Sequence, residues 1–169
     1  METEVKIKVS DLEPIRQRLR ALGARHLSTV DEENIYLDRG GELEARGQSL
    51  RLRQDQGVRL TWKGATDFRD GVVVRPEVEV AVSRFADALE ILNRLGFQPT
   101  EVLDKRRETW RLGDVQVTLD ALGFGVFVEL EGDRAAIVVA AGELGLDPRQ
   151  GIGVPYRKLG RGRRPPGSV

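Results

Sequence analysis

The amino-acid sequence predicts an α+β protein: a closed eight-stranded antiparallel β-barrel with a polar lumen, flanked by helices and built from two pseudo-repeated halves. Three observations support this prediction. Nearly every predicted strand alternates charged with aliphatic residues, two amphipathic helices are easily recognised, and each of these helices follows a similar acidic strand. A barrel with charged faces inward and aliphatic faces outward under helices is the inverse of the usual soluble barrel, whose interior is packed with apolar side chains.

The first strand, residues 2–9, alternates with a period of two residues. One face carries Thr3, Val5, Ile7 and Val9. The other face carries Glu2, Glu4, Lys6 and Lys8. This period is typical of a half-buried strand. A row of two carboxylates and two ammonium groups is costly unless a ligand or a partner compensates it.

The segment SDLEPIRQRLRALG, residues 10–23, predicts a helix. Ser10 is the expected N-cap and forms a capping box with Glu13, and Gly23 is the expected C′ residue. The segment 83–96 repeats this plan. Because an E-x-E-V strand precedes each helix and hairpin signals follow it, the chain predicts a duplicated strand–helix–strands unit.

The later strands continue the alternation. Their charged faces carry Arg51 and Arg53 (50–53), Arg59 and Lys63 (59–63), Glu77 and Glu79 (77–82), Lys105 and Arg107 (103–111), Asp120 (115–120), and Glu129 and Glu131 (126–131). For any single strand, a polar face in water explains this pattern. Glu and Asp are poor strand formers, however, so carboxylate pairs at i and i+2 on three strands favour a functional face.

A chain of 169 residues is long enough for one domain, or for two small halves that share a core. We expect one domain over residues 1–159. Residues 65–71 predict a polar loop and residues 133–146 predict a third helix. Residues 160–169 are basic and rich in proline and glycine, which predicts a disordered tail.

The composition argues against several classes of protein. Lys plus Arg and Asp plus Glu number 27 each, so the chain lacks the basic excess of a nucleic-acid binder. There is no cysteine and one histidine, His26, which excludes disulfides, thiolate chemistry and histidine-clustered zinc. No apolar run approaches the length of a membrane span. We therefore expect a cytoplasmic protein without nucleic-acid or membrane partners, either a monomer or a homodimer.

The charged faces have a common chemical explanation. Carboxylates on one face repel one another, and a divalent cation offsets that cost. Clustered Arg and Lys side chains need a multivalent anion in the same way. Hard oxygen ligands suit Mg²⁺ or Mn²⁺, and bidentate arginine together with lysine suits phosphate oxygens. The sequence therefore predicts a site for a metal ion together with a polyphosphate.

With these residues assigned, the chain resembles the triphosphate tunnel metalloenzyme superfamily, also called CYTH proteins after class IV adenylyl cyclase and thiamine triphosphatase. The resemblance extends over residues 1–159 and rests on an ordered set of motifs. They are E-x-E-x-K at Glu2, Glu4 and Lys6; LRLR with Arg51 and Arg53; LTWKG with Lys63; E-x-E at Glu77 and Glu79; K-x-R at Lys105 and Arg107; and LDALGFGVFVELE with Asp120, Glu129 and Glu131.

The resemblance implies that the barrel is a triphosphate tunnel and gives each motif a role. The implied ligands of Mg²⁺ or Mn²⁺ are Glu2, Glu4, Glu129, Glu131 and Asp120, with Glu79 as a further candidate. The implied ligands of the triphosphate are Lys6, Arg51, Arg53, Lys63, Lys105 and Arg107. The candidates for the catalytic group are Lys6, Glu79 and Asp120. Lys8 and Arg59 are expected at the site or at its rim, and Arg75, Arg106 and Arg111 are expected to be surface charges.

This superfamily supports two reactions. In a class IV cyclase, the ribose 3′-hydroxyl of ATP attacks the α-phosphorus, which gives cyclic AMP and pyrophosphate. In a triphosphatase, water attacks a terminal phosphorus of inorganic triphosphate or of an organic triphosphate. The layout of the whole chain favours the cyclase branch; the hydrolase, and then a non-catalytic nucleotide or polyphosphate-binding protein, are the alternatives. Two departures from the family pattern, Asn34 in NIYLD and the segment PYRKLG, leave the choice of substrate open.

Overall fold

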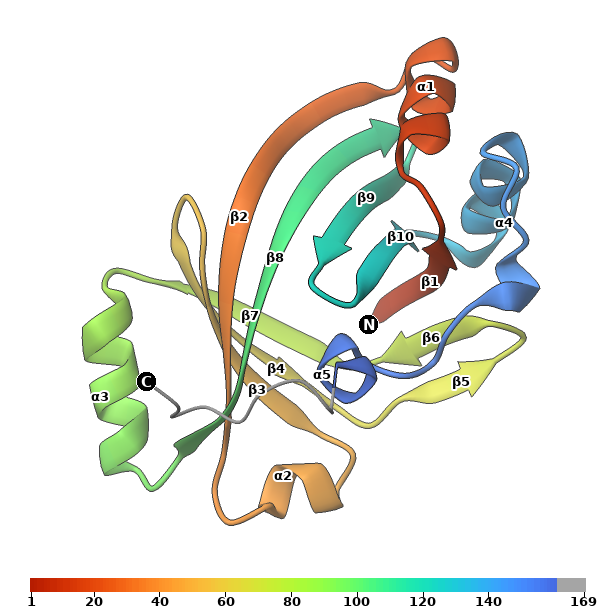
Figure 1. The fold of residues 1–169 in the computed structure, drawn as a ribbon. Coiled ribbons are helices and arrows are strands. Elements are labelled where there is room, and N and C mark those ends of the chain that lie inside the picture. The colour runs from red at the N-terminus through yellow and green to blue at the C-terminus, as the bar shows by residue number, and fades with distance from the viewer. Residues whose placement is uncertain (161–169) are drawn as a thin grey trace. The chain divides into compact units, whose positions relative to one another are not determined.

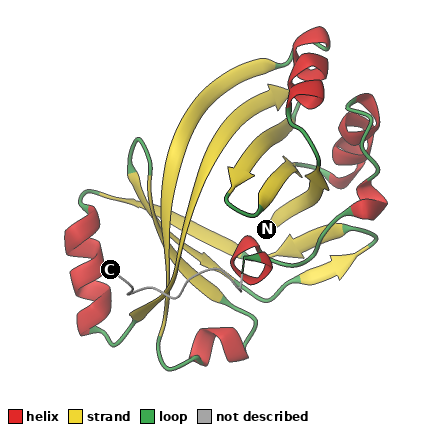
Figure 2. Cartoon of the chain, in the orientation of Figure 1, coloured by secondary structure: helices red, strands yellow, loops and turns green. Residues whose placement is uncertain are grey.

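A computed structural model describes residues 1–160 of the chain, and within them the fold is α+β (Figure 2). The described residues form ten strands: β1 (Glu2–Val9), β2 (Arg25–Asp38), β3 (Ser49–Gln54), β4 (Val58–Lys63), β5 (Asp67–Arg69), β6 (Val72–Arg75), β7 (Glu77–Val82), β8 (Gln98–Leu112), β9 (Val115–Leu122) and β10 (Gly125–Glu131). The α-helices are α1 (Glu13–Ala21), α2 (Glu42–Ala45), α3 (Phe85–Arg94), α4 (Arg134–Glu143) and α5 (Tyr156–Leu159), and Pro148–Gln150 form a 3₁₀ turn. The predicted α+β class with flanking helices is confirmed.

All ten strands belong to one sheet, in the order β5-β6-β1-β10-β9-β8-β2-β3-β4-β7. The sequence predicts eight strands, and the short hairpin of β5 and β6 increases that number. This hairpin begins inside residues 65–71, so the prediction of a loop there is wrong for Asp67–Arg69. Asp70 and Gly71, both with positive φ, form its turn. The closure of the sheet into a barrel stays a prediction.

The chain divides into two compact units, and the long strands β2 and β8 contribute residues to both. Unit 1 comprises Met1–Val30, Thr66–Arg75 and Lys105–Gly153. Unit 2 comprises Asp31–Ala65, Pro76–Asp104 and the described residues from Val154 onward.

The core of unit 1 lies between the aliphatic faces of β1, β9 and β10 and the helices α1 and α4 (Figure 1). Val5 from β1 and Leu130 from β10 are fully buried there. Leu19 from α1 and Ile137 from α4 are equally inaccessible. The aliphatic faces predicted from the period of two residues therefore do pack under helices in this unit.

The core of unit 2 lies between α3 and the strands β2, β3, β4 and β7. Leu52 from β3 and Leu92 from α3 are buried in it. Strand β7 is covered less completely, because Val78 is 60% exposed and Val80 is 50% exposed. The aliphatic face of this last strand in the sheet order is only partly covered within residues 1–160.

The two pseudo-repeated halves exchange their hairpins. Strand β1 of the first half pairs with β10 of the second half, with Val5 opposite Leu130. Strand β7 of the second half pairs with β4 of the first half, with Val80 opposite Leu60. Each compact unit is thus built from both halves of the sequence.

Helix α1 begins later than the sequence predicts. Its N-cap is Leu12, which makes no side-chain hydrogen bond, so the predicted capping box of Ser10 and Glu13 is wrong. The Glu13 amide instead donates a hydrogen bond of 3.0 Å to Asp11 Oδ1. Gly23, with a φ of 72°, follows the helix as predicted.

The predicted tail lies outside the described residues, except for Gly160. The arrangement as one domain over residues 1–159 stays a prediction. Within residues 1–160, every helix is too short or too polar to cross a membrane.

The core assignment predicts how two leucines respond to the same substitution. Leu130→Ala is expected to lower the free energy of unfolding by about 2–5 kcal/mol, because a fully buried side chain is removed and a cavity remains. Leu95→Ala is the matched control, because Leu95 is 61% exposed, and its effect is expected to stay within about 0.5 kcal/mol. Equilibrium unfolding in urea measures both changes, and equal losses would contradict the assignment.

A bidentate ion pair fixes α1 to β8. Arg16 donates from Nε to Glu108 Oε2 at 3.0 Å and from Nη2 to Oε1 at 2.6 Å. These hydrogen bonds lower the pKa of Glu108 below its usual value, against the opposing effect of burial. A lowered pKa means that the pair stabilises the fold above the unfolded-state pKa, and that this stabilisation is lost as the pH falls through the folded-state pKa.

We expect Glu108→Gln to lower the free energy of unfolding at pH 7 by about 1.5–3 kcal/mol, the usual value of a hydrogen bond to a charged group. The difference from the wild type should narrow as the pH falls below the unfolded-state pKa of Glu108 and through its lowered folded-state pKa, because the wild-type carboxylate then also becomes protonated. Urea unfolding over a series of pH values tests this. A difference that does not depend on pH would show that the carboxylate charge is not the source of the stability.

Candidate functional site

An acidic set, made of Glu2, Glu4, Glu129 and Glu131, lies on the charged faces of β1 and β10 in unit 1. Glu4 lies opposite Glu131 in the antiparallel register, and Lys6 lies opposite Glu129. Glu2, Glu4 and Lys6 are buried, whereas Glu131 is exposed. Lys6 Nζ lies 3.6 Å from Glu129 Oε1. Four of the glutamates predicted as metal ligands, Glu2, Glu4, Glu129 and Glu131, therefore share one face of two neighbouring strands, whereas the further candidate Glu79 lies on β7 in unit 2.

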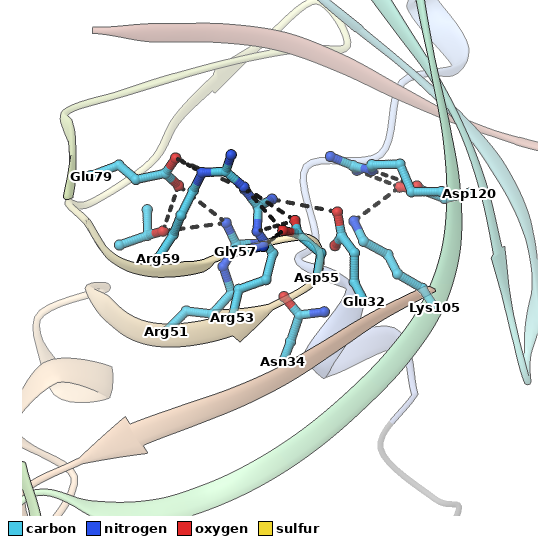
Figure 3. A network of polar contacts seen from close by, with 12 residues as sticks. Glu32, Asn34, Arg51, Arg53, Asp55, Gly57, Arg59, Glu79, Lys105 and Asp120 are labelled. Atoms are coloured by element: carbon cyan, nitrogen blue, oxygen red, sulfur yellow. Dashed lines mark hydrogen bonds and ion pairs between the residues drawn. The ribbon is translucent and has the colours of Figure 1, made fainter. Parts of the chain in front are cut away.

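Asp120 on β9 is fully buried and binds two cations from β8. Arg107 lies opposite Asp120 and donates from Nε to Oδ1 at 2.7 Å. Lys105 donates from Nζ to Asp120 Oδ2 at 3.3 Å, as Figure 3 shows. Arg107 also forms an ion pair with Glu129. Asp120, a predicted metal ligand, is thus in contact with two predicted phosphate ligands and is placed to orient them.

The prediction that Arg75 is a surface charge is wrong. Its side chain is only 12% exposed. Nε donates to Glu2 Oε2 at 2.7 Å, and Nη2 donates to Glu4 Oε1 at 3.1 Å. Arg75 ends β6, which runs beside β1 (Figure 1), and it lies directly opposite Glu2. The register between two distant strands brings it into the acidic set, and no local pattern in the sequence reveals that register.

The acidic set has the donor chemistry of a divalent-metal site. Burial raises the pKa of Glu4, and the nearby Glu129 and Glu2 raise it further, against the effects of Arg75 and Lys6. A divalent cation would relieve this repulsion, and carboxylate oxygens are the ligands that Mg²⁺ and Mn²⁺ prefer. Within residues 1–160, no three acidic or histidine side chains already surround one point as metal ligands would. The residues therefore fit such an ion in donor type, and coordination requires movement of their side chains.

A basic set, made of Arg51, Arg53 and Arg59, lies on the charged faces of β3 and β4 in unit 2. Glu79 on β7 is its acidic partner. Arg53 lies opposite Arg59, and both Arg51 and Glu79 lie opposite Thr61. Thr61 donates from Oγ1 to Glu79 Oε2 at 2.7 Å. Glu79 lies 3.9 Å from Nη2 of Arg51 and of Arg53, and 3.6 Å from Nε of Arg59 (Figure 3). One carboxylate thus faces three guanidinium groups at distances longer than a good hydrogen bond.

Arg53 has two further acidic partners that the sequence predictions do not include. Its Nη1 lies 3.5 Å from Glu32 Oε1, and its Nε lies 3.4 Å from Asp55 Oδ2. Burial lowers the pKa of Arg53, and so does the neighbouring Arg51, whereas Glu32, Glu79 and Asp55 raise it. Arg53 is therefore a cation that is removed from water and only loosely paired.

A polar face on β2 contains Glu32 and Asn34, which are both buried. Ile35 and Leu37, which belong to the opposite face, are buried in the core of unit 2. This alternation can be read from the sequence, and it is the signal that places Glu32 on the polar face of β2, near the basic set. Asn34 donates from Nδ2 to the Leu103 carbonyl at 3.1 Å, and its Oδ1 has no hydrogen-bond partner within residues 1–160.

The remaining predicted site residues lie nearer the ends of their strands. Lys63 lies opposite Glu77, and its Nζ is 2.8 Å from Glu77 Oε2. The Arg59 side chain is 41% exposed and forms an ion pair of 3.2 Å with Asp55. Lys8 is exposed. Arg59 and Lys8 thus occupy less buried positions than the predicted phosphate ligands Lys6, Arg51 and Arg53.

Comparisons with known proteins give a consistent result. The family model described as CYTH domain matches residues 1–144. A Methanocaldococcus jannaschii protein provisionally named an adenylate cyclase is 29% identical over 136 residues, which cover 78% of this chain and 76% of that protein. The structure of a Pyrococcus horikoshii protein, 26% identical, has a TM-score of 0.81, and the match covers 94% of this chain and 99% of that chain. A Hippeastrum protein, described as a provisional adenylyl cyclase with a dominant triphosphatase activity, is 19% identical with a TM-score of 0.71 and 94% of each chain covered.

The loosely paired arginines predict that the folded chain binds inorganic triphosphate. The midpoint of thermal unfolding should rise with triphosphate concentration, because the anion binds the folded state and not the unfolded one. Arg53→Gln is expected to weaken this binding by about 1.5–3 kcal/mol, the value of a hydrogen bond to a charged group. Arg69→Gln serves as the control, because the Arg69 side chain is 77% exposed on β5. If triphosphate raises the unfolding midpoint of both variants as much as it raises that of the wild type, the basic set is not the anion site.

Proposed function

Because the chain belongs to the CYTH family, we propose that it is a divalent-metal-dependent enzyme that acts on a triphosphate substrate. The proposed reaction is that of a class IV adenylyl cyclase, which converts ATP to cyclic AMP and pyrophosphate. The similarity to the M. jannaschii protein provisionally named an adenylate cyclase supports this choice. Hydrolysis of inorganic triphosphate or of an organic triphosphate is the alternative, because it needs the same phosphate and metal ligands without a site for a nucleoside.

The basic set of unit 2 is the observation that carries the proposal. The side chains of Arg51 and Arg53 are 13% and 12% exposed. Within residues 1–160, Arg51 nevertheless makes only long polar contacts, 3.4 Å to Thr61 Oγ1 and 3.9 Å to Glu79. Guanidinium groups in such surroundings usually hold bidentate partners at shorter distances. The oxygens of a triphosphate would supply those partners, and several cations on one face match a multivalent anion.

The acidic set of unit 1 is proposed to hold the metal ion through Glu2, Glu4, Glu129 and Glu131. When bound, Mg²⁺ or Mn²⁺ neutralises phosphate charge and makes an attacking hydroxyl or water a better nucleophile. In this proposal Asp120 has a positioning role, since it is fully buried and holds both Lys105 and Arg107. Lys105 and Arg107 would then contribute positive charge that attracts phosphate oxygens.

The reaction also needs a group that takes a proton. In cyclisation, the bond from the 3′-oxygen to the α-phosphorus forms while the bond from this phosphorus to pyrophosphate breaks, and the hydroxyl proton passes to a base. Glu79 is the proposed base, because its side chain is 32% exposed and Thr61 fixes its orientation. Lys6, with 5% of its side chain exposed, is proposed to neutralise charge that develops on the phosphate oxygens.

A product assay distinguishes the reactions. The protein is incubated with ATP, and separately with inorganic triphosphate, in the presence of Mg²⁺ or Mn²⁺ at neutral and alkaline pH. Cyclic AMP with pyrophosphate is the expected result. Orthophosphate with pyrophosphate or ADP would instead establish the hydrolase. Recovery of intact triphosphate bound to the protein would contradict enzymatic function and favour a binding protein.

Removal of one carboxylate tests the acidic set. Glu4→Gln is expected to reduce turnover by ~100-fold or more, because metal assistance contributes several kcal/mol to the transition state and each 1.36 kcal/mol is a factor of ten in rate. Glu90→Gln is the matched control on α3, where the side chain is 58% exposed, and it should keep the wild-type rate. Circular dichroism and urea unfolding establish that both variants are folded. A normal rate for Glu4→Gln would refute the proposed metal ligands.

A further inference from the structure

We propose that Arg75 is a built-in counter-cation of the acidic set, and that a divalent metal ion must displace it from Glu2 and Glu4 in order to bind. This inference deepens the proposed function and rests on it, because it takes Glu2 and Glu4 to be metal ligands. It assigns to Arg75 a part in setting the affinity of the protein for its metal.

The pairing of β6 with β1 places Arg75 where it reaches both carboxylates. In this antiparallel pair Arg75 lies opposite Glu2, and Val73 lies opposite Glu4. Arg75 contacts Glu2 directly across the two strands at 2.7 Å and reaches diagonally to Glu4 at 3.1 Å. The planar guanidinium, with donors that point in fixed directions, is suited to bridge two acids in this way.

Burial makes this ion triad important for the stability of the metal-free protein. The side chains of Glu2 and Glu4 are each 8% exposed, and that of Arg75 is 12% exposed. Although burial alone would lower the pKa of Arg75, Glu4 and Glu2 raise it. Without the guanidinium, the buried carboxylates of Glu2 and Glu4 would repel each other, Glu129 would repel Glu4 as well, and Lys6 would still attract Glu4. Arg75 thus compensates charge that would otherwise oppose folding.

The same contacts make Arg75 a competitor of the metal. Its Nε and Nη2 donate to Glu2 Oε2 and Glu4 Oε1, which are oxygens that a metal ion would coordinate. A guanidinium and a divalent cation also repel each other at these short distances. The free energy of metal binding therefore includes the loss of two charge-assisted hydrogen bonds. Removal of Arg75 should make the metal-free protein less stable and its metal site stronger.

Binding of Mn²⁺ to the full chain, without any triphosphate, tests this inference. Isothermal titration calorimetry is carried out on the wild type, Arg75→Gln, Arg75→Lys and Arg16→Gln. Arg75→Gln is expected to bind Mn²⁺ at least about tenfold more tightly, because the two competing charge-assisted hydrogen bonds of Arg75 no longer have to be broken. Arg75→Lys should show a smaller gain, because one ammonium group cannot bridge both carboxylates. Arg16→Gln, the control for a half-buried arginine in the same unit that pairs with Glu108, should keep the wild-type affinity.

Thermal unfolding gives a second readout that does not depend on activity. Without metal, Arg75→Gln should unfold at a lower temperature than the wild type, and Mn²⁺ should raise its midpoint by more than it raises that of the wild type. Equal or weaker Mn²⁺ binding by Arg75→Gln would overturn the inference, because Arg75 would then support the metal site. If Arg75→Gln does not fold, an unchanged or weaker affinity of Arg75→Lys overturns it.

Glu4→Gln separates this inference from the proposed function. If Glu4→Gln loses Mn²⁺ affinity while Arg75→Gln gains none, the metal site stands and only the role of Arg75 is refuted. If Glu4→Gln binds Mn²⁺ like the wild type, the assigned metal ligands are wrong and both proposals fall.

Discussion

Charge compensation on the charged faces of the strands is the constraint on which the other features of this structure depend. A charged group that leaves water is stable only if opposite charges or hydrogen-bond partners lie within reach. Asp120 satisfies this requirement with Lys105 and Arg107 from the neighbouring strand. Arg53 satisfies it less well, through Glu32 and other carboxylates at 3.4 Å or more. The ion pairing is therefore tighter around Asp120 than around Arg53. Loosely paired groups are the ones that a bound ligand of opposite charge would stabilise most.

The two halves of the duplicated sequence have the same order of elements but carry different charges. Each E-x-E strand pairs with a hairpin from the other half, but the two hairpins carry opposite charges. In unit 1, Glu4 lies opposite another acid, Glu131, so negative charge accumulates. In unit 2, Glu79 lies opposite Thr61 and faces the cations of β3 and β4, so positive charge dominates its surroundings. Exchange of hairpins between the halves thus separates an acidic set from a basic set without any change in topology.

Most of the fold, and the strand faces that carry the candidate site residues, could be predicted from the sequence, because a strand's two faces are determined locally. The period of two residues places Glu4 and Lys6 on one face of β1 and Val5 on the other, and burial of Val5 in the core confirms that division. Residues that meet through strand register could not be predicted in this way. Arg75 follows three valines at the end of a short strand, and nothing near it in the sequence shows that β6 pairs with β1.

Other differences between the prediction and the structure arise because a neighbouring residue or strand makes an interaction that the sequence pattern does not show. Ser10 and Glu13 have the spacing of a capping box, but Asp11 accepts the Glu13 amide and the helix starts at Glu13. The segment that contains Asp67–Arg69 is polar and short, which is typical of a loop, yet β6 offers it an edge to pair with. Glu32 lies on a strand whose alternation is readable, but its partnership with Arg53 depends on the pairing of β2 with β3.

The pairing of β1 with β10 also has a consequence for biosynthesis. Strand β1 is synthesised well before β10, with which it pairs, so this edge of β1 stays unpaired until the residues between the two strands have been made. Contacts between such distant segments slow folding and lengthen the time in which a nascent strand can aggregate. The glutamates and lysines that alternate with its valines and isoleucine counter this hazard, because charged gatekeepers discourage β-aggregation. The same side chains that are proposed to serve the mature enzyme would therefore protect the unfinished chain.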